Sequence, residues 1–299
     1  MGGTRFVGKA IVEEFQKSKN EITLFTRGKN SLPNNVLHIK GDRNNYEDLL
    51  QLKNKKFDLV VDTSGRNKDQ TKHLIDVIGA PLHRLIYISS AGVYKKTENY
   101  PYSEESEVDE YSRHYGKVET ENWLIEEGIP FTSFRPTYIY GPGNYNPIER
   151  WFFDRVCKKT TIPIPNDGQI ITQLGHVKDL AIAINISKDN DIAKNKIYNC
   201  SGNKSISIIG LIKTVCSVCN VPFNSIDVKS FDISRIDSKA RKLFPIRLNH
   251  FMTDISLIKT DLNWEPHFNL LDGLRDSFEK DYKVNDFTFN NDNDSLLFE

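Results

Sequence analysis

Glycines at positions 2, 3 and 8 constrain the fold more than any other feature of this sequence. Glycines spaced in this way between a buried strand and a helix permit a tight turn, and they let backbone N–H groups approach a pyrophosphate. Residues 9–17 have the apolar periodicity of the helix that should follow. Arg5 stands where a three-glycine fingerprint has its middle glycine, so the motif is incomplete. A plain turn near a chain end is the alternative interpretation.

No strand-like segment precedes this turn within the 299 residues, so the pattern predicts a sheet whose first strand is missing. A parallel sheet without a central strand leaves backbone groups unpaired in the core. We therefore expect the codons directly upstream of Met1 to encode about five to seven apolar, β-branched-rich residues, the length of an ordinary strand.

Strand-like and helix-like stretches alternate along the chain, which predicts an α/β fold with a Rossmann-type, doubly wound parallel sheet and a smaller C-terminal lobe. The most apolar strand, 84–90, should lie centrally in the sheet. The predicted strands are 21–26, 36–39, 57–62, 84–90 and 131–136, and the predicted helices are 70–78, 119–127 and 208–219. We expect a Rossmann-type core over 1–143, the smaller lobe with the last core elements over 144–284, and a flexible tail over 285–299.

The composition of the chain bears on three classes of function: nucleic-acid binding, membrane association and metal binding. The 40 basic residues balance the 40 acidic residues, so any nucleic-acid site must be a local patch rather than a property of the whole surface. No apolar run approaches the roughly 18 residues that cross a bilayer, and no signal peptide is evident, which predicts a cytoplasmic protein without a membrane partner. Cys216 and Cys219 have the spacing of half a zinc site, but no second pair follows, so we predict buried thiols and no metal.

The residues after the predicted strand 21–26, which is the second strand of such a fold when the missing first strand is counted, indicate which dinucleotide would bind. An acidic side chain there suits NAD, whereas Arg27 suits the 2′-phosphate of NADP, unless it is simply a solvated basic turn. Polar residues at other strand ends would face the ligand crevice, although they are also common in turns. The predicted cofactor-binding residues are Gly2, Gly3, Arg5, Gly8, Arg27, Asp42, Asp62, Ser64 and Lys117.

Four segments, in order, carry a resemblance to a known family: 2–8, 88–94, 135–142 and 262–266. With them the chain resembles the extended short-chain dehydrogenase/reductases of the NAD-dependent epimerase/dehydratase superfamily. In active members a hydroxyl residue and a Tyr-x-x-x-Lys pair share the proton transfer. The resemblance implies that Ser90 is the hydroxyl residue and Lys117 the lysine, both vestigial.

Arg113 occupies the position of the catalytic tyrosine, four residues before Lys117. A guanidinium stays protonated and cannot act as the base, so the standard chemistry is predicted to be lost. Tyr111 and Tyr115 flank the position and are the alternative bases. Thr172 stands where epimerases carry an arginine for the sugar-nucleotide diphosphate, a second departure from the family pattern.

Longer strings narrow the resemblance further: 3–6, 24–29, 112–114, 138–147 and 173–179. They closely resemble the chloroplast stem-loop-binding proteins and their cyanobacterial relatives. That resemblance implies binding of mRNA and ribosomal RNA stem-loops, association with ribosomes and, in one branch, endoribonuclease activity.

The residues offer local basic patches for such a ligand. The predicted RNA-binding residues are Arg113, His114, Arg235, Lys239, Arg241, Lys242 and Arg247, with Tyr94, Tyr115, Tyr138 and Tyr140 for base stacking. The segment Trp151–Phe153 is predicted as core or as a contact in a homo-oligomer. We therefore predict an RNA-binding protein with a vestigial or regulatory NADP pocket. Two alternatives stay open: an NADP-dependent nucleotide-sugar epimerase, dehydratase or reductase, and a ribosome-associated scaffold without RNA specificity of its own.

Overall fold

The computed structural model describes residues 1–146 and 148–298, which divide into two compact units. Unit 1 comprises 1–137, 177–201 and 253–265, and unit 2 comprises 138–176, 202–252 and 266–299. The chain thus returns to unit 1 twice after first leaving it. These returns supply the last elements of the core.

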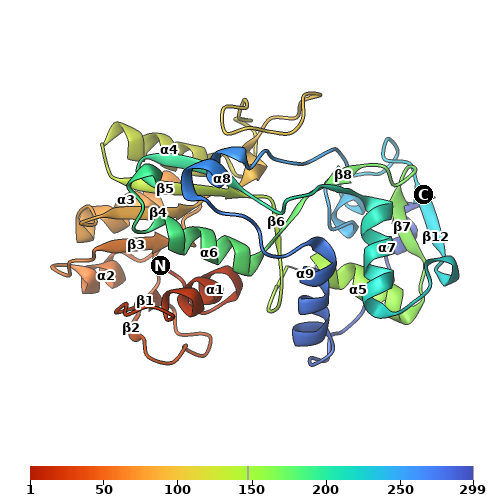
Figure 1. Ribbon diagram of the computed structural model, residues 1–299, viewed down its shortest axis with the longest axis horizontal. Helices are drawn as coiled ribbons and strands as arrows, with labels where there is room; N and C mark the ends of the chain where they lie inside the picture. Colours follow the sequence, from red (N-terminus) through yellow and green to blue (C-terminus); the bar gives the residue numbers. More distant parts are fainter. Residues whose placement is uncertain (147, 299) are drawn as a thin grey trace. The chain divides into compact units, whose positions relative to one another are not determined.

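Unit 1 is a parallel α/β unit with helices on both faces of its strands (Figure 1). Helices α1 and α6 pack together on one face, and α3 and α4 pack together on the other. Its elements are α1 (Phe6–Phe15), β1 (Thr23–Thr26), β2 (Leu37–Lys40), α2 (Tyr46–Leu49), β3 (Leu59–Asp62), α3 (Lys68–Ile78), β4 (Arg84–Ile88), α4 (Tyr115–Glu126), β5 (Phe131–Pro136), α6 (Val177–Ser187), β10 (Lys196–Cys200) and α8 (Ser256–Leu262).

The strands of unit 1 form two parallel sheets rather than one. Strands β1 and β2 pair with each other, and a four-stranded sheet has the order β10-β5-β4-β3. Every residue of β4 and β5 is buried, as expected for inner strands covered on both faces. The predicted central position of 84–90 is therefore confirmed within the four-stranded sheet.

Unit 2 consists of short strands and helices around its own apolar cluster. Its elements are β6 (Tyr138–Tyr140), α5 (Ile148–Lys158), β7 (Ile162–Pro165), β8 (Ile171–Thr172), β9 (Leu174–His176), β11 (Ile206–Ser207), α7 (Ile208–Cys219), β12 (Val228–Phe231) and α9 (Leu270–Ser277). The side chain of Ser207 caps the start of α7 by accepting a hydrogen bond from Gly210, and Asn220 ends the helix in the left-handed region.

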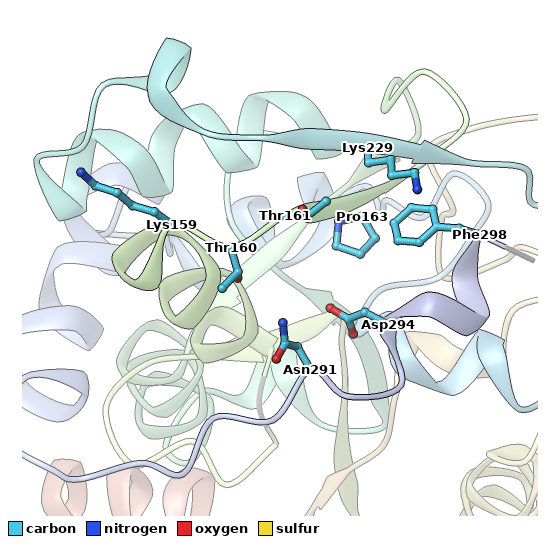
Figure 2. A pocket seen from close by; sticks show the side chains of 8 residues that line it. All are labelled: Lys159, Thr160, Thr161, Pro163, Lys229, Asn291, Asp294 and Phe298. Carbon is cyan, nitrogen blue, oxygen red and sulfur yellow. The ribbon is translucent and has the colours of Figure 1, made fainter.

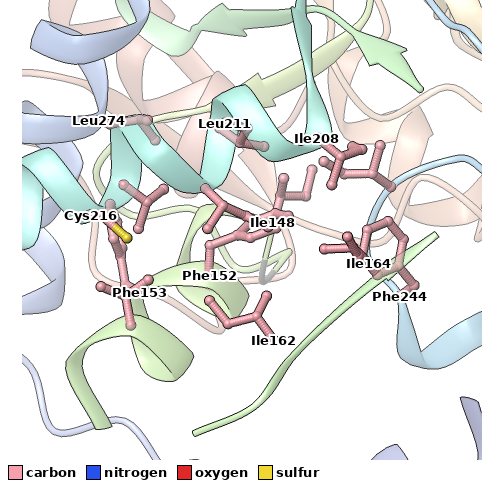
Figure 3. Packing of buried hydrophobic residues seen from close by; sticks show 14 of the residues in the cluster. Ile148, Phe152, Phe153, Ile162, Ile164, Ile208, Leu211, Cys216, Phe244 and Leu274 are labelled. Atoms are coloured by element: carbon pink, nitrogen blue, oxygen red, sulfur yellow. The ribbon is translucent and has the colours of Figure 1, made fainter. Parts of the chain in front are cut away.

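Figure 3 shows the cluster in which α5 and α7 bury their apolar faces. Phe152 and Phe153 of α5 are fully buried there, and Cys216 of α7 lies among them. The predicted burial is confirmed for Phe152, Phe153 and Cys216, whereas Trp151 and Cys219 are only half-buried. Each such aromatic ring removes a large apolar area from water, which stabilises unit 2.

The last residues make specific contacts with the rest of unit 2. Leu297 lies in the short 3₁₀ helix Asp294–Leu297 and is buried in the same cluster. Asp294 accepts two hydrogen bonds from Arg155, at 2.7 and 2.8 Å. The sequence predicted a flexible tail here because 285–299 lacks periodicity, and such long-range contacts leave no periodic signal.

Glu149, at the first turn of α5, is a buried carboxyl group in unit 2. It accepts hydrogen bonds from the backbone of Gly141, the amide of Asn144 and the hydroxyl of Ser277, at 2.8–3.2 Å. Burial nevertheless raises the pKa of Glu149 to about 7. The folded protein therefore holds this proton at pH values where the unfolded chain releases it.

We expect Glu149→Gln to flatten the dependence of stability on pH. Between pH 4.5 and 7 the folded state binds more protons at this residue than the unfolded state, so its contribution to stability falls as the pH rises. Over this pH range the free energy of unfolding should fall by roughly 3 kcal/mol in the parent protein because of Glu149. This decrease should be absent in the variant. Urea unfolding of both proteins at pH 5 and pH 7.5 measures it, and parallel pH profiles would contradict the assignment.

Candidate functional site

The glycine turn of unit 1 leads directly into α1. Gly2 and Gly3 have φ angles of 86° and 108°, which side-chain-bearing residues rarely adopt. A Cβ atom on Gly8 would lie 2.6 Å from the backbone nitrogen of Gly3, so the turn and the helix approach too closely for any other residue. Arg5 is the N-cap residue of α1, with an extended backbone and an exposed side chain. This turn fits a dinucleotide pyrophosphate at the N-terminus of a helix.

A buried ion pair lies at the carboxyl end of β3. Both terminal nitrogens of Arg43 donate to the carboxylate of Asp62, at 2.5 and 3.0 Å. The carboxylate also accepts hydrogen bonds from the hydroxyl of Thr71 and the backbone N–H groups of Ser64 and Gly65. Burial raises the pKa of Asp62, but Arg43 outweighs that effect and holds the pKa below its usual value. The carboxylate is thus ionised and fully hydrogen-bonded.

Arg43 joins three parts of unit 1 through its guanidinium. Besides Asp62, it donates to the hydroxyl of Ser64 and to the backbone carbonyl of Gln70 in α3. Sequence reasoning placed Asp62 and Ser64 among the cofactor contacts and did not single out Arg43. The only local signal was its position just after β2 and Asp42. The cofactor contacts predicted for Asp62 and Ser64 remain predictions. Both side chains are already hydrogen-bonded to Arg43.

The other predicted cofactor residues at strand ends are placed differently. Asp42 accepts hydrogen bonds from the backbone and side chain of Asn44, so it stabilises the turn after β2. Arg27 follows β1 and is exposed. Its guanidinium is therefore accessible to a ligand at the end of β1.

Ser90 and Lys117, which the resemblance predicts as a vestigial catalytic pair, both form hydrogen bonds with the protein's own backbone. The hydroxyl of Ser90 accepts a hydrogen bond from the backbone of Gly92. The ammonium of Lys117 donates to the carbonyl oxygens of Gly65 and Ile88, at 3.2 and 2.5 Å. Burial lowers the pKa of Lys117 to about 8. Lys117 thus connects the ends of two strands to α4.

The residues around position 113, where the resemblance places the catalytic tyrosine, differ in exposure and in their contacts. Tyr111 is 96% exposed. Tyr115 is the first residue of α4, and within the described residues neither phenol is hydrogen-bonded to Lys117. Arg113 is exposed and donates from Nε to the ring of His114, at 3.1 Å. This part of unit 1 presents a cation to solvent where the family has a phenol.

The predicted RNA-binding residues of unit 2 fall into two groups. Arg235, Lys239 and Lys242 are exposed, and we call them the unit 2 basic surface. Arg241 donates to the carbonyl oxygens of Phe244 and Ile246, and Arg247 lies over the ring of Phe251 at 4.5 Å. The last two residues therefore support the local backbone and packing.

The expected stacking residues are only partly accessible. Tyr94 and Tyr140 are each 2% exposed, so the expectation that they stack on bases does not hold for these two. Tyr94 stacks on Tyr102 and bonds to Asn199, and Tyr140 packs edge-on against His176. Tyr115 and Tyr138 are half-buried.

Unit 2 also contains a cavity of about 470 Å³ that sequence reasoning did not find (Figure 2). Residues from three distant segments line it: Lys159, Thr160, Thr161, Pro163, Lys229, Asn291, Asp294 and Phe298. The carboxylate of Asp294 is bound to Arg155, and the ammonium of Lys229 lies over the ring of Phe298 at 4.2 Å. No single stretch of sequence carries a signal for such a cavity.

Within residues 1–146 and 148–298, no group of three His, Cys, Asp or Glu side chains could hold a metal ion. In the same ranges no helix is both long and apolar enough to span a membrane.

The model of the NAD dependent epimerase/dehydratase family matches residues 1–201. The chloroplast stem-loop binding protein of 41 kDa b from Arabidopsis thaliana is 40% identical over 298 residues, covering 94% of this chain and 78% of that protein. The chain belongs to the NAD-dependent epimerase/dehydratase family. Within that family, it belongs to the branch of the chloroplast stem-loop-binding proteins.

Solved structures agree with this assignment at the level of the fold. Pal from Bacillus thuringiensis has a TM-score of 0.77 at 20% identity, covering 95% of this chain and 98% of that one. UDP-glucose 4-epimerase from Thermotoga maritima, solved with UDP-glucose, has a TM-score of 0.77 at 17% identity, covering 95% and 97%. UDP-glucuronic acid 4-epimerase from Bacillus cereus, solved with NAD, has a TM-score of 0.75 at 17% identity, covering 95% and 97%. The predicted Rossmann-type fold is confirmed.

We expect Asp62→Ala to destabilise unit 1 strongly. The variant leaves the buried Arg43 cation without its partner, which typically costs about 3–5 kcal/mol. Asp76→Ala is the matched control, because Asp76 pairs with Lys72 on the exposed face of α3, and little change is expected there. Denaturant unfolding of both variants measures the difference. Equal stability of the two would contradict a structural role for the buried pair.

Proposed function

We propose that this protein binds RNA stem-loops on an epimerase/dehydratase scaffold that no longer performs the family's proton transfer. The observation that carries the proposal is the replacement at the catalytic position. Arg113 is an exposed cation where a base is needed, and the ammonium of Lys117 is bound to two backbone carbonyls. A protonated guanidinium binds phosphate and cannot accept the substrate's proton.

The charge distribution supports a local site. The whole chain is neutral, so RNA would be held by patches rather than by net charge. The exposed Arg113 with the half-buried His114 on unit 1, and the unit 2 basic surface, are accessible groups of this kind. A curated relative at 40% identity is named for stem-loop binding, which favours RNA over other polyanions. Association with ribosomes and a cytoplasmic location belong to the same proposal.

The glycine turn and Arg27 support a retained dinucleotide pocket. The turn accommodates a pyrophosphate, and the exposed Arg27 at the end of β1 suits the 2′-phosphate of NADP. Bound NADP would act as a hydride carrier or as a regulatory ligand. Gly2, Gly3 and Gly8 would hold its pyrophosphate, and Arg27 its 2′-phosphate. Lys117 would contribute little to catalysis while it bonds to the backbone.

Labelled stem-loop RNA should bind with an affinity that falls steeply with salt. Each phosphate contact that is lost should reduce the slope of log K against log salt by about 0.7–0.9. We therefore expect Arg113→Ala, and separately the pair Lys239→Ala and Lys242→Ala, to weaken binding and lower the slope. Fluorescence anisotropy over a range of salt concentrations measures both quantities.

Lys72→Ala is the control, because Lys72 is exposed but lies on α3, outside both patches. RNA binding no stronger than that of an unrelated neutral protein would refute the proposal. Turnover of a nucleotide sugar that is abolished by Tyr111→Phe or Tyr115→Phe would instead support the enzyme alternative.

NADP should bind more tightly than NAD, and Arg27→Asp should reverse that order. The substitution replaces a charge-assisted contact to the 2′-phosphate with repulsion, so we expect NADP affinity to fall roughly tenfold or more. Affinity for NAD should change little and serves as the control in the same variant. Isothermal titration calorimetry with both nucleotides measures the ratio, and an unchanged ratio would remove Arg27 from the pocket.

A further inference from the structure

Residues 286–294 carry acidic and aromatic side chains and no basic side chain. The acidic residues are Asp286, Asp292 and Asp294, and the aromatic residues are Phe287 and Phe289. We call this stretch the acidic-aromatic segment. A single RNA strand has the same two features, because its phosphates are negative and its bases are flat rings. The segment therefore offers a basic surface the kinds of contact that RNA offers.

The acidic-aromatic segment lies against three cations of α5. The guanidinium of Arg150 lies over the ring of Phe287, at 4.6 Å. The ring of Phe289 lies 5.6 Å from the guanidinium of Arg155 and 5.6 Å from the ammonium of Lys158. All three cations belong to one helix, and we call them the α5 cations. Each of them thus meets an aromatic ring of the segment.

Arg155 is the α5 cation that the segment covers most completely. Its side chain is 3% exposed, and its Nη2 donates to both carboxylate oxygens of Asp294, at 2.7 and 2.8 Å. Its Nε is buried and has no hydrogen-bond partner among the described residues. Asp294 therefore uses only one of the two donors, Nε and Nη2, that lie on the same side of the guanidinium. A phosphate can accept from both donors at once.

The segment is loosely packed at the cavity of about 470 Å³ (Figure 2). Asn291 and Asp294 line this cavity together with Thr160, whose hydroxyl is buried and has no hydrogen-bond partner within residues 1–146 and 148–298. Unfilled space forfeits contacts, and a buried hydroxyl without a partner costs free energy. Both effects weaken the hold of the segment on unit 2. Leu297 is buried in the apolar cluster and anchors the residues that follow the segment.

The α5 cations adjoin the unit 2 basic surface. The segment leads into the 3₁₀ helix Asp294–Leu297, which packs against the 3₁₀ helix Ala240–Leu243, and the latter carries one residue of the basic surface. Trp151 connects the same two places, because its indole N–H donates to the carbonyl of Leu243 at 3.0 Å and its ring contacts Arg155 at 3.7 Å. Lifting the segment would therefore extend the unit 2 basic surface onto α5.

We propose that the α5 cations form a further RNA-binding surface, which the acidic-aromatic segment covers in the free protein. The inference rests on the proposed function, because it takes stem-loop RNA as the ligand. When RNA binds, its phosphates replace the carboxylate of Asp294 on Arg155, and unpaired bases replace the rings of Phe287 and Phe289. The measured RNA affinity of this surface is then its affinity when open, multiplied by the fraction of the protein in which it is open. The segment thus acts as an autoinhibitory cover.

Loosening the segment should strengthen RNA binding. The double variant Phe287→Ala with Phe289→Ala removes both rings from α5 and leaves every α5 cation in place. We expect it to bind labelled stem-loop RNA about five- to tenfold more tightly than the parent, measured by fluorescence anisotropy at constant salt. Phe223→Ala is the matched control, because its ring lies 5.2 Å from the ammonium of Lys213 on α7 rather than on α5. The control should bind RNA as the parent does.

Two further variants and one further measurement make the test specific. Asp294→Asn keeps both rings and weakens only the ion pair with Arg155, so it should raise the affinity about two- to threefold. Adding Arg150→Ala and Lys158→Ala to the double variant should return the affinity to the parent's value or below it. Hydrogen exchange of residues 286–294 reports release of the segment directly. It should be faster in both loosened variants, and in the parent when RNA is added.

The outcomes separate this inference from the proposed function. Faster exchange in 286–294 without tighter RNA binding would overturn the inference, and the proposed function would stand because the parent still binds RNA. A gain in affinity that persists after Arg150→Ala and Lys158→Ala would also overturn it, because the RNA would then be held elsewhere. If neither the parent nor any variant binds RNA, the proposed function itself fails and the inference fails with it.

Discussion

The buried ion pair between Arg43 and Asp62 organises the strand ends of unit 1. Through it the loop after β2, the end of β3 and the start of α3 are held by one guanidinium and one carboxylate. A charge buried without its partner costs several kcal/mol, so neither side chain can move away independently. The Asp62 carboxylate also holds the backbone of Ser64 and Gly65, and the carbonyl of Gly65 accepts from Lys117. Accordingly, the position of Lys117 depends on the same pair.

This arrangement shows which family features also have a structural role, so that the scaffold can persist without the family's proton transfer, as we propose. The glycine turn is required by backbone conformation and close approach, whether or not a nucleotide binds. Lys117 is likewise retained by two backbone carbonyls that need a donor. Arg113, at the predicted tyrosine position, is exposed and donates a hydrogen bond to its neighbour His114. The glycine turn and Lys117 thus have structural roles in the fold that do not depend on catalysis.

Much of the fold could be predicted from local patterns. The apolar runs of β4 and β5 and the periodicity of α7 are properties of contiguous residues, and the structure places these elements within a few residues of the predicted bounds. Strand β10 was not predicted, because its five residues are only partly apolar and become a strand by pairing with β5. The contribution of 253–265 to unit 1 also depends on contacts between distant segments.

The sequence by itself determined the family, the α/β class, the glycine turn and the arginine four residues before Lys117, because each of these depends on residue types at short spacing. Tertiary structure decided that Asp62 binds Arg43, that Tyr94 and Tyr140 are buried, and that β10 pairs with β5. These outcomes depend on which distant segments meet and on what remains accessible to water. Burial and pairing across tens of residues have no local signature, so only the folded chain could reveal them.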